Sequence, residues 1–313
     1  MSVKGRIVII SGPTSTGKSD IAVEIAKRLD GEIVSADSMQ VYKGMDIGTG
    51  KLSEDEMQGI RHHLISVIEP TESYSVSRFR DMALEAIDGI LSRGKLPIVV
   101  GGTGFYIRSM LYTADGTEPG KDPEYKRQLR SRAEKEGIAA LYDELKMKDP
   151  DAADRIDRNN TYRIIRALEY NHSTGRRYSE HCDDSVASEP RYDALMLVME
   201  CDRSVLYRRM DERVDRMFEN GLIEEVRSLL SRGVDSDCTS MNGIGYKETA
   251  RYLSGEIPLE EAKRLIKSNT HRYAVRQSTW FRNQKDVVMI DCSDRDRALN
   301  EMLERISSFS SCA

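Results

Sequence analysis

Short apolar runs along the chain alternate with segments in which apolar side chains recur at helical spacing. Residues 6–10 are apolar and β-branched, as in a buried parallel strand, and residues 19–29 carry apolar side chains on one helical face. Further strand-like runs lie at 32–36, 97–101, 194–199 and 287–290. Because strands that alternate with helices form parallel sheets, we predict an α/β fold with its ligands at the carboxyl ends of the strands.

One long segment interrupts this alternation. Between about 115 and 191 the sequence is highly charged and poor in strand-like runs. Its flanks, 115–120 and 183–190, have the composition of linkers. We therefore predict an inserted all-helical subdomain at 116–190, within an α/β core formed by 1–115 and 191–313. The expected helices are 123–136, 138–148 and 161–170 in the insert, and 204–220, 222–232 and 259–282 in the core.

The turn between the first strand and the first helix fits the eight-position phosphate-binding loop. Glycines let the backbone N–H groups turn toward phosphate oxygens, Lys18 adds a positive charge, and Ser19 can ligate Mg²⁺. A Gly-rich turn could match by chance, but the flanking strand and helix are those that the motif requires. We predict a P-loop NTPase-like core that binds a di- or triphosphate. The loop consists of Gly12, Pro13, Thr14, Ser15, Thr16, Gly17, Lys18 and Ser19.

Two polar turns follow other strands of the predicted sheet. Asp37 comes directly after the strand at 32–36, where its carboxylate could take a proton from a nucleophile or could simply cap the next turn. The segment 101–104 is a second Gly-rich turn, in which Thr103 offers a hydroxyl. Such turns approach ligands in some proteins and serve packing in others, so this signal alone is weak.

Two helical segments carry arginines that could reach phosphates. Arg209, Arg213 and Arg216 share one helical face, although the same spacing suits ion pairs with the acids between them. In 272–282, basic residues are interleaved with aromatic residues and Gln277, a pattern that suits a nucleic-acid backbone and an unstacked base. The alternative is a core tryptophan, Trp280, beneath a solvated charged face.

Composition narrows the functional classes. The net charge of −5 argues weakly against a nucleic-acid partner, but the segment 263–285 contains seven Lys or Arg and no acid. The chain has no apolar run near the ~20 residues that span a bilayer, and its first strand leaves no room for a signal peptide, so we expect a cytoplasmic protein without membrane contact. Its five cysteines lack zinc-ligand spacing and are expected to be free thiols.

Eight sequence blocks are distributed over essentially the whole chain. They are GPTSTGKS at 12–19, DSMQVYKGMDIGT at 37–49, HHL at 62–64, GGTGFY at 101–106, YRIIRALE at 162–169, ERVDRM at 212–217, GIGYKE at 243–248 and RQSTWFR at 276–282. In this order the blocks resemble the bacterial tRNA dimethylallyltransferase family; one phosphate loop is common to many families, but the ordered set is specific. The resemblance implies transfer of a dimethylallyl group from dimethylallyl diphosphate to N6 of the adenosine on the 3′ side of the tRNA anticodon, position 37.

The resemblance also implies roles for individual residues. Asp37 would be the general base, Thr103 would lie at the reacting centre, and Arg213 and Lys18 would neutralise the departing diphosphate together with Mg²⁺. The partner would be the tRNA anticodon stem-loop, and we expect a monomer. One expected tRNA contact is missing, because Val275 stands where the family often has lysine. The implied tRNA-binding residues are Asp37, Ser38, Met39, Gln40, Tyr162, Arg163, Ile164, Ile165, Arg166, Gly243, Gly245, Tyr246, Lys247, Arg276, Gln277, Thr279, Trp280 and Arg282.

Three other functions fit part of the sequence. A small-molecule P-loop kinase would use the phosphate loop and Asp37, but it has no use for the basic aromatic helix. An adenylate isopentenyltransferase, which acts on free adenine nucleotide, would not need Arg163, Arg166 or the block at 276–282. A non-catalytic RNA-binding module would leave the phosphate loop unexplained.

Overall fold

The computed structural model describes residues 4–112, 122–184 and 189–311. The chain divides into two compact units, one formed by Met1–Leu111 and Tyr192–Ala313 and the other by Tyr112–Arg191. The predicted insert at 116–190 falls inside the second unit. The predicted linker at 115–120 lies outside the described residues, as do residues 185–188 of the other predicted linker.

The first unit is built on a six-stranded sheet in the order β3-β2-β4-β1-β5-β6. All five strand pairs are parallel, which confirms the predicted α/β fold. The inner residues of the central strands are apolar and buried because helices cover both faces of the sheet. The strands are β1 (Arg6–Ser11), β2 (Gly31–Ser35), β3 (His62–His63), β4 (Leu96–Gly101), β5 (Asp193–Glu200) and β6 (Val287–Asp291).

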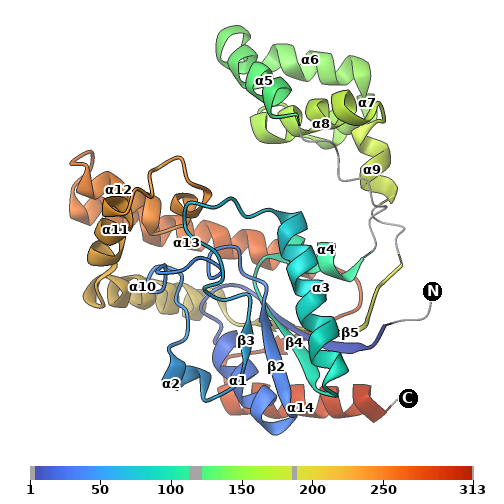
Figure 1. Ribbon diagram of the computed structural model, residues 1–313, viewed down its shortest axis with the longest axis vertical. Helices are drawn as coiled ribbons and strands as arrows, with labels where there is room; N and C mark the ends of the chain where they lie inside the picture. The colour runs from blue at the N-terminus through green and yellow to red at the C-terminus, as the bar shows by residue number, and fades with distance from the viewer. Residues whose placement is uncertain (1–3, 113–121, 185–188, 312–313) are drawn as a thin grey trace. The chain divides into compact units, whose positions relative to one another are not determined.

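Two hydrophobic clusters lie on the two faces of this sheet. On one face, α1 (Lys18–Arg28) and α14 (Arg295–Ser311) contact each other and lie together at the lower end of Figure 1. The other face packs against α3 (Val76–Ser92) and α4 (Gly104–Leu111). The remaining elements of this unit are α2 (Glu54–Met57), α10 (Arg203–Glu219), α11 (Leu222–Ser231), η1 (Thr239–Asn242), α12 (Tyr246–Leu253) and α13 (Leu259–Arg282).

The described part of the second unit is helical, apart from one isolated β-bridge between Tyr112 and Pro190, and has a hydrophobic core of its own. Leu129, Leu141 and Leu145 meet Ile164 and Ile165 in that core. The unit consists of α5 (Pro123–Glu136), α6 (Ile138–Lys148), α7 (Pro150–Arg155), α8 (Thr161–Thr174) and α9 (Tyr178–Asp184). Within the described parts of both units, no helix is both long enough and apolar enough to cross a bilayer.

Candidate active site

The phosphate loop links β1 to α1 and is held tightly against a neighbouring strand. Gly12 has φ 138°, and a Cβ at this position would lie 2.5 Å from the Met199 carbonyl oxygen, so only glycine fits. Thr16 Oγ1 donates to the Pro13 carbonyl at 2.9 Å, and Lys18 Nζ donates to the same oxygen at 3.1 Å. The loop therefore keeps its conformation through its own hydrogen bonds.

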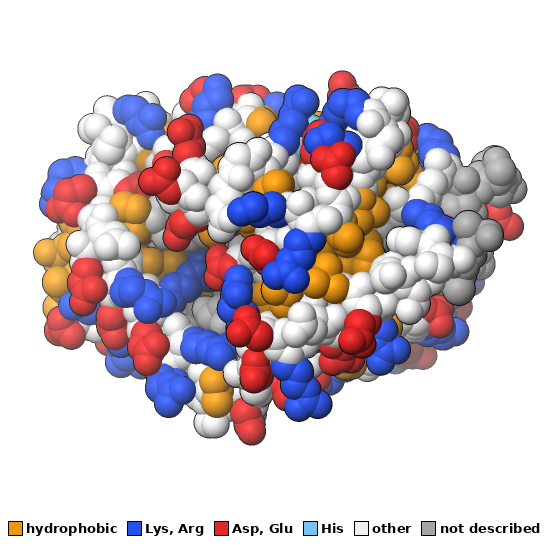
Figure 2. All heavy atoms as spheres, turned by 90° about the horizontal axis from the view of Figure 1, so that it is seen from below, with side chains coloured by type: hydrophobic (Ala, Val, Ile, Leu, Met, Phe, Trp, Pro, Cys, Tyr) orange, Lys and Arg blue, Asp and Glu red, His pale blue; other side chains and the backbone are white. Residues whose placement is uncertain are grey.

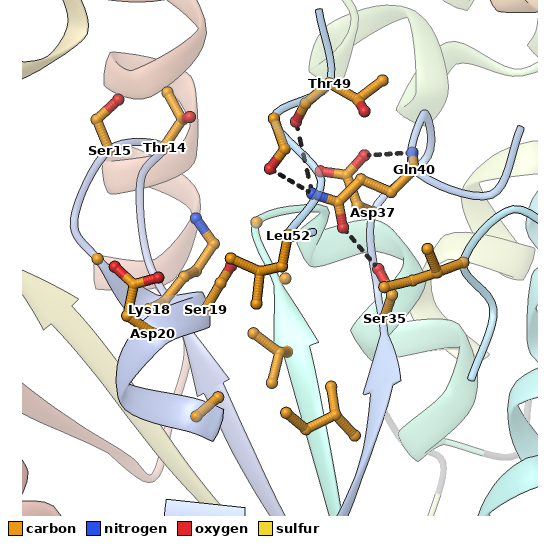
Figure 3. A pocket seen from close by; sticks show the side chains of 18 of the residues that line it. Thr14, Ser15, Lys18, Ser19, Asp20, Ser35, Asp37, Gln40, Thr49 and Leu52 are labelled. Atoms are coloured by element: carbon orange, nitrogen blue, oxygen red, sulfur yellow. Dashed lines mark hydrogen bonds between the residues drawn. The ribbon is translucent and has the colours of Figure 1, made fainter. Parts of the chain in front are cut away.

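Beside this loop lies a cavity of about 230 Å³, here called the loop cavity, which Thr14, Ser15, Lys18 and Ser19 line. Figure 3 shows Lys18 reaching into it from the start of α1, with Asp37, Gln40 and Thr49 across the space. Burial, together with the nearby Arg213 charge, lowers the pKa of Lys18 to about 8. The positive charges of Lys18 and Arg213 repel each other, so an anion bound in this cavity would be stabilised by both.

Asp37 begins the turn after β2 and also faces the cavity. Its Oδ1 accepts hydrogen bonds from the backbone N–H groups of Met39, at 2.8 Å, and Gln40, at 3.2 Å. The structure thus contains the turn cap that was the alternative to a catalytic role. The two roles are compatible, because the cap fixes the carboxylate while the residue still lines the cavity.

Arg213 connects α10 to the phosphate loop. Its Nη1 donates to Thr14 Oγ1 at 2.6 Å and its Nη2 donates to the Thr49 carbonyl at 3.0 Å. The neighbouring acids on α10 have other partners, since Asp215 pairs with Lys267 at 2.8 Å. Burial lowers the pKa of Arg213, and the negative charge of Asp37 opposes that shift. This geometry favours a phosphate-facing arginine over a surface ion pair.

The backbone that receives Arg213 is held in place by the partly buried carboxylate of Glu225. Glu225 accepts hydrogen bonds from the N–H groups of Asp46, Ile47 and Gly48 at 2.8, 2.8 and 3.1 Å. It also accepts one from the Tyr246 hydroxyl at 2.6 Å. Sequence reasoning missed Glu225, because no local pattern shows that α11 meets a loop almost 180 positions earlier. Tyr246 is fully buried, so its side chain supports this loop from inside.

Helix α13 forms hydrogen bonds with both Gly-rich turns. Gln277 Oε1 accepts from the Thr14 N–H at 3.0 Å, and its Nε2 donates to the Gly102 carbonyl at 2.9 Å. A Cβ at Gly102 would collide with Gln277, and one at Gly104 would collide with Trp280. The second Gly-rich turn is therefore a close packing site for α13.

Thr103 is partly exposed, but its hydroxyl oxygen is buried within this packing. Its hydroxyl lies beside the Tyr273 phenol and does not line the loop cavity. Burial raises the pKa of Tyr273 to about 12, and the charge of Asp37 adds to the shift. Tyr273 itself does line the cavity. The structure thus places Tyr273, which sequence reasoning did not select, beside Thr103 and on the wall of the loop cavity.

A second cavity of about 310 Å³ lies on the other side of Asp37 and Arg213. It is here called the methionine cavity, because Met39, Met210 and Met217 line it. Ser38, Gly243 and Arg276 also line it. An aromatic ring of a ligand could pack there against the polarizable methionine side chains. The residues shared by both cavities are Thr14, Asp37, Thr49, Arg213 and Tyr273.

The other residues implied in tRNA binding fall into two groups by exposure. Lys247, Thr279 and Arg282 are exposed on α12 and α13, whereas Gly245 is buried at the start of α12 and Gln277 is only 6% exposed. Arg282 forms an ion pair with Glu200.

In the helical unit, exposure again separates the predicted tRNA contacts. Tyr162 and Arg163 are exposed, and Arg166 Nη1 donates to Glu169 at 3.2 Å. Ile164 and Ile165 are buried in the core of that unit. Their side chains stabilise α8 and are not presented on its surface.

Comparison with protein families gives two matches that together span most of the chain. The IPP transferase model matches residues 40–284, and the Isopentenyl transferase model matches residues 5–69. The second match contains the phosphate loop and Asp37, and the first contains Arg213 and α13. Both parts of the candidate site therefore fall within family-matched sequence.

Curated and solved relatives agree with these matches. The chain is 47% identical over 292 residues to a tRNA dimethylallyltransferase of Geobacillus thermodenitrificans, covering 93% of this chain and 92% of that one. It is 44% identical over 290 residues to the tRNA dimethylallyltransferase of Bacillus subtilis, again covering 93% and 92%.

Two crystal structures extend the similarity to the fold. A full-length tRNA isopentenylpyrophosphate transferase from Bacillus halodurans is 42% identical with a TM-score of 0.74, covering 97% of this chain and 96% of that one. A eukaryotic dimethylallyltransferase, described as acting on tRNA, is 29% identical with a TM-score of 0.82, covering 98% and 80%. The predicted resemblance is confirmed, and the chain belongs to the IPP transferase family.

Proposed function

We propose that this enzyme transfers a dimethylallyl group from dimethylallyl diphosphate to N6 of the adenosine at position 37 of tRNA, giving N6-isopentenyladenosine. One observation carries the assignment: Asp37 and Arg213 line both the loop cavity, which suits an anion, and the more apolar methionine cavity. A prenyl transfer needs this pairing, because a diphosphate must leave on one side while an amine attacks from the other. The names and titles of the relatives support the same reaction.

The loop cavity would hold the diphosphate. Lys18, Arg213 and the amides of the phosphate loop supply positive charge to its oxygens. Oxygen donors from Ser19 and Asp20 line the same cavity and suit Mg²⁺, which keeps few protein ligands when it binds phosphates. Bound there with Ser19 as a ligand, Mg²⁺ would neutralise charge on the leaving group.

The methionine cavity would hold the target adenine, which must leave the anticodon-loop stack to reach it. N6 attacks the allylic carbon, the carbon–oxygen bond breaks, and its electron pair leaves with the diphosphate. Asp37 accepts the proton that N6 loses, while Arg213 and Lys18 stabilise the departing oxygens. Thr103, whose hydroxyl is buried beside Tyr273, would position that phenol at the reacting centre.

The partner would be the anticodon stem-loop of tRNA. Exposed residues of α13 and α12, among them Arg276, Thr279 and Lys247, would contact it, as would Tyr162 and Arg163 of the helical unit. Both cavities are lined by one chain, which supports a monomer as the active form. We expect the enzyme to act in the cytoplasm, where its proposed tRNA substrate is found.

The test combines two anticodon stem-loops with several donors. One RNA carries adenosine at the target position and its matched control carries guanosine, which lacks the N6 amine. With dimethylallyl diphosphate and Mg²⁺, mass spectrometry should show a five-carbon addition on the first RNA only. ADP release from ATP without RNA modification would support a kinase, and faster modification of free AMP than of RNA would support an adenylate isopentenyltransferase.

A further inference from the structure

Two cysteines meet at the carboxyl ends of neighbouring strands, outside the proposed active site. The last paired residues of β5 and β6 are Glu200 and Asp291, and Cys201 and Cys292 are the next residues of the two strands. The Cys292 N–H donates to the Glu200 carbonyl at 2.8 Å, so the parallel alignment continues through the cysteines. The two residues are 91 positions apart and their proximity is not evident from the sequence.

Both side chains point to the same face of the sheet. Leu197 and Met199 on β5 belong to the hydrophobic cluster beneath α1 and α14, as does Ile290 on β6. Side chains alternate with a period of two, so Cys201 and Cys292 continue these rows, and both belong to that cluster. Neighbouring strands lie about 4.8 Å apart, within the range of about 4.4 to 6.8 Å between the Cα atoms of a disulfide.

The two thiols differ in exposure and in acidity. Cys292 is buried, whereas Cys201 is partly exposed. A hydrogen bond from Cys292 lowers the pKa of Cys201, and the nearby Arg209 charge acts in the same direction. The same hydrogen bond raises the pKa of Cys292, and burial adds to that shift. Cys201 is thus the nucleophile of the pair and Cys292 is a protonated neighbour within reach.

We propose that Cys201 and Cys292 form a peroxide-reactive thiol pair whose disulfide slows the enzyme. The Cys201 thiolate attacks one oxygen of hydrogen peroxide, the O–O bond breaks, and a sulfenic acid and one water result once the departing hydroxide takes a proton. The Cys292 thiol then attacks the sulfenic sulfur, the S–O bond breaks, and a second water leaves. Two thiols are oxidised to a disulfide and one peroxide is reduced to two waters.

The disulfide would act on the site through packing. Cys201 also contacts a small cluster that contains Met210 of α10 and Ala274 of α13. Those helices carry Arg213 and Gln277, which hold Thr14 of the phosphate loop. A bond to Cys292 draws Cys201 toward β6 and away from this cluster.

The chemical test is disulfide mapping of the full chain after brief treatment with hydrogen peroxide. Tryptic peptides 192–203 and 286–295 should appear joined and two hydrogen atoms lighter than the separate pair, and dithiothreitol should reverse the link. In Cys292→Ala, dimedone should trap a sulfenic acid on Cys201, because the resolving thiol is gone. In Cys201→Ala, the buried Cys292 should stay reduced. Cys238→Ser is the matched control and should still form the bond.

Activity is measured on the same samples. The oxidised wild type should lose most of its turnover and recover it in dithiothreitol, whereas oxidised Cys201→Ala should keep its untreated rate. Oxidation of Cys238 with the pair still reduced would overturn the proposal, and so would full turnover by a chain shown to carry the disulfide. The mapping does not depend on the proposed reaction, so failure of one is separable from failure of the other.

Discussion

At the scale of the residue, Asp37 combines a structural and a proposed chemical role. Asp37→Asn keeps the Oδ1 acceptor that caps Met39 and Gln40 but removes the carboxylate that would take the proton. We expect turnover to fall by roughly 10²-fold or more with little change in tRNA or diphosphate affinity. Single-turnover kinetics measure this directly. A rate close to that of the wild type would mean that Asp37 only caps the turn and does not act as the base.

Lys18 should give the donor site a pH dependence of its own. Its cationic form predominates below a pKa of about 8 and is lost above it, so kcat/KM for the diphosphate donor should fall as pH rises through that value. Lys18→Arg keeps its charge at every such pH and should remove this fall, although its geometry lowers the overall rate. An equal fall in both proteins would assign the titration to another group.

At the scale of the element, α13 should support the donor site from its buried face and tRNA from its exposed face. Gln277→Met keeps the volume but removes the hydrogen bonds to Thr14 and Gly102. We expect KM for the donor to rise roughly tenfold, as for the removal of two hydrogen bonds of about 0.5 to 1.5 kcal/mol each, with KM for tRNA nearly unchanged. Arg276→Ala, its exposed neighbour, should show the opposite pattern. If Gln277→Met instead raised KM for tRNA alone, Gln277 would contact RNA.

Helices and strands were predictable from the sequence where apolar side chains recur at regular spacing within the element itself. The expected helices at 123–136, 138–148 and 259–282 have the same bounds in the structure as α5, α6 and α13, because each has a regular apolar face. The two-residue strand β3 is too short to show any period. The contacts of Glu225 and Gln277 could not be predicted either. Each side chain forms hydrogen bonds with backbone atoms far away in the sequence, and such contacts leave no local pattern.

At the scale of the whole molecule, charge is more evenly distributed than the sequence suggests. The acid-free segment 263–285 meets acids from other parts of the chain, since Lys267 pairs with Asp215 and Arg282 with Glu200. Within the described residues, Arg272 and Arg276 have no acidic partner. Figure 2 shows basic and acidic side chains intermixed on the side seen from below Figure 1. The tRNA surface is therefore expected to depend on few arginines.

This distribution predicts unequal salt effects along α13. Removing one cation that binds a phosphate should reduce the slope of log affinity against log salt by about 0.7 to 0.9. Arg276→Ala should show this full reduction, because Arg276 is exposed and lines the methionine cavity. Lys267→Ala should show less, since its charge is already balanced by Asp215 at 2.8 Å. Equilibrium binding of tRNA over a range of KCl concentrations measures both slopes. Equal reductions would mean that tRNA displaces the Asp215 pair, and no reduction in either variant would place the tRNA surface away from α13.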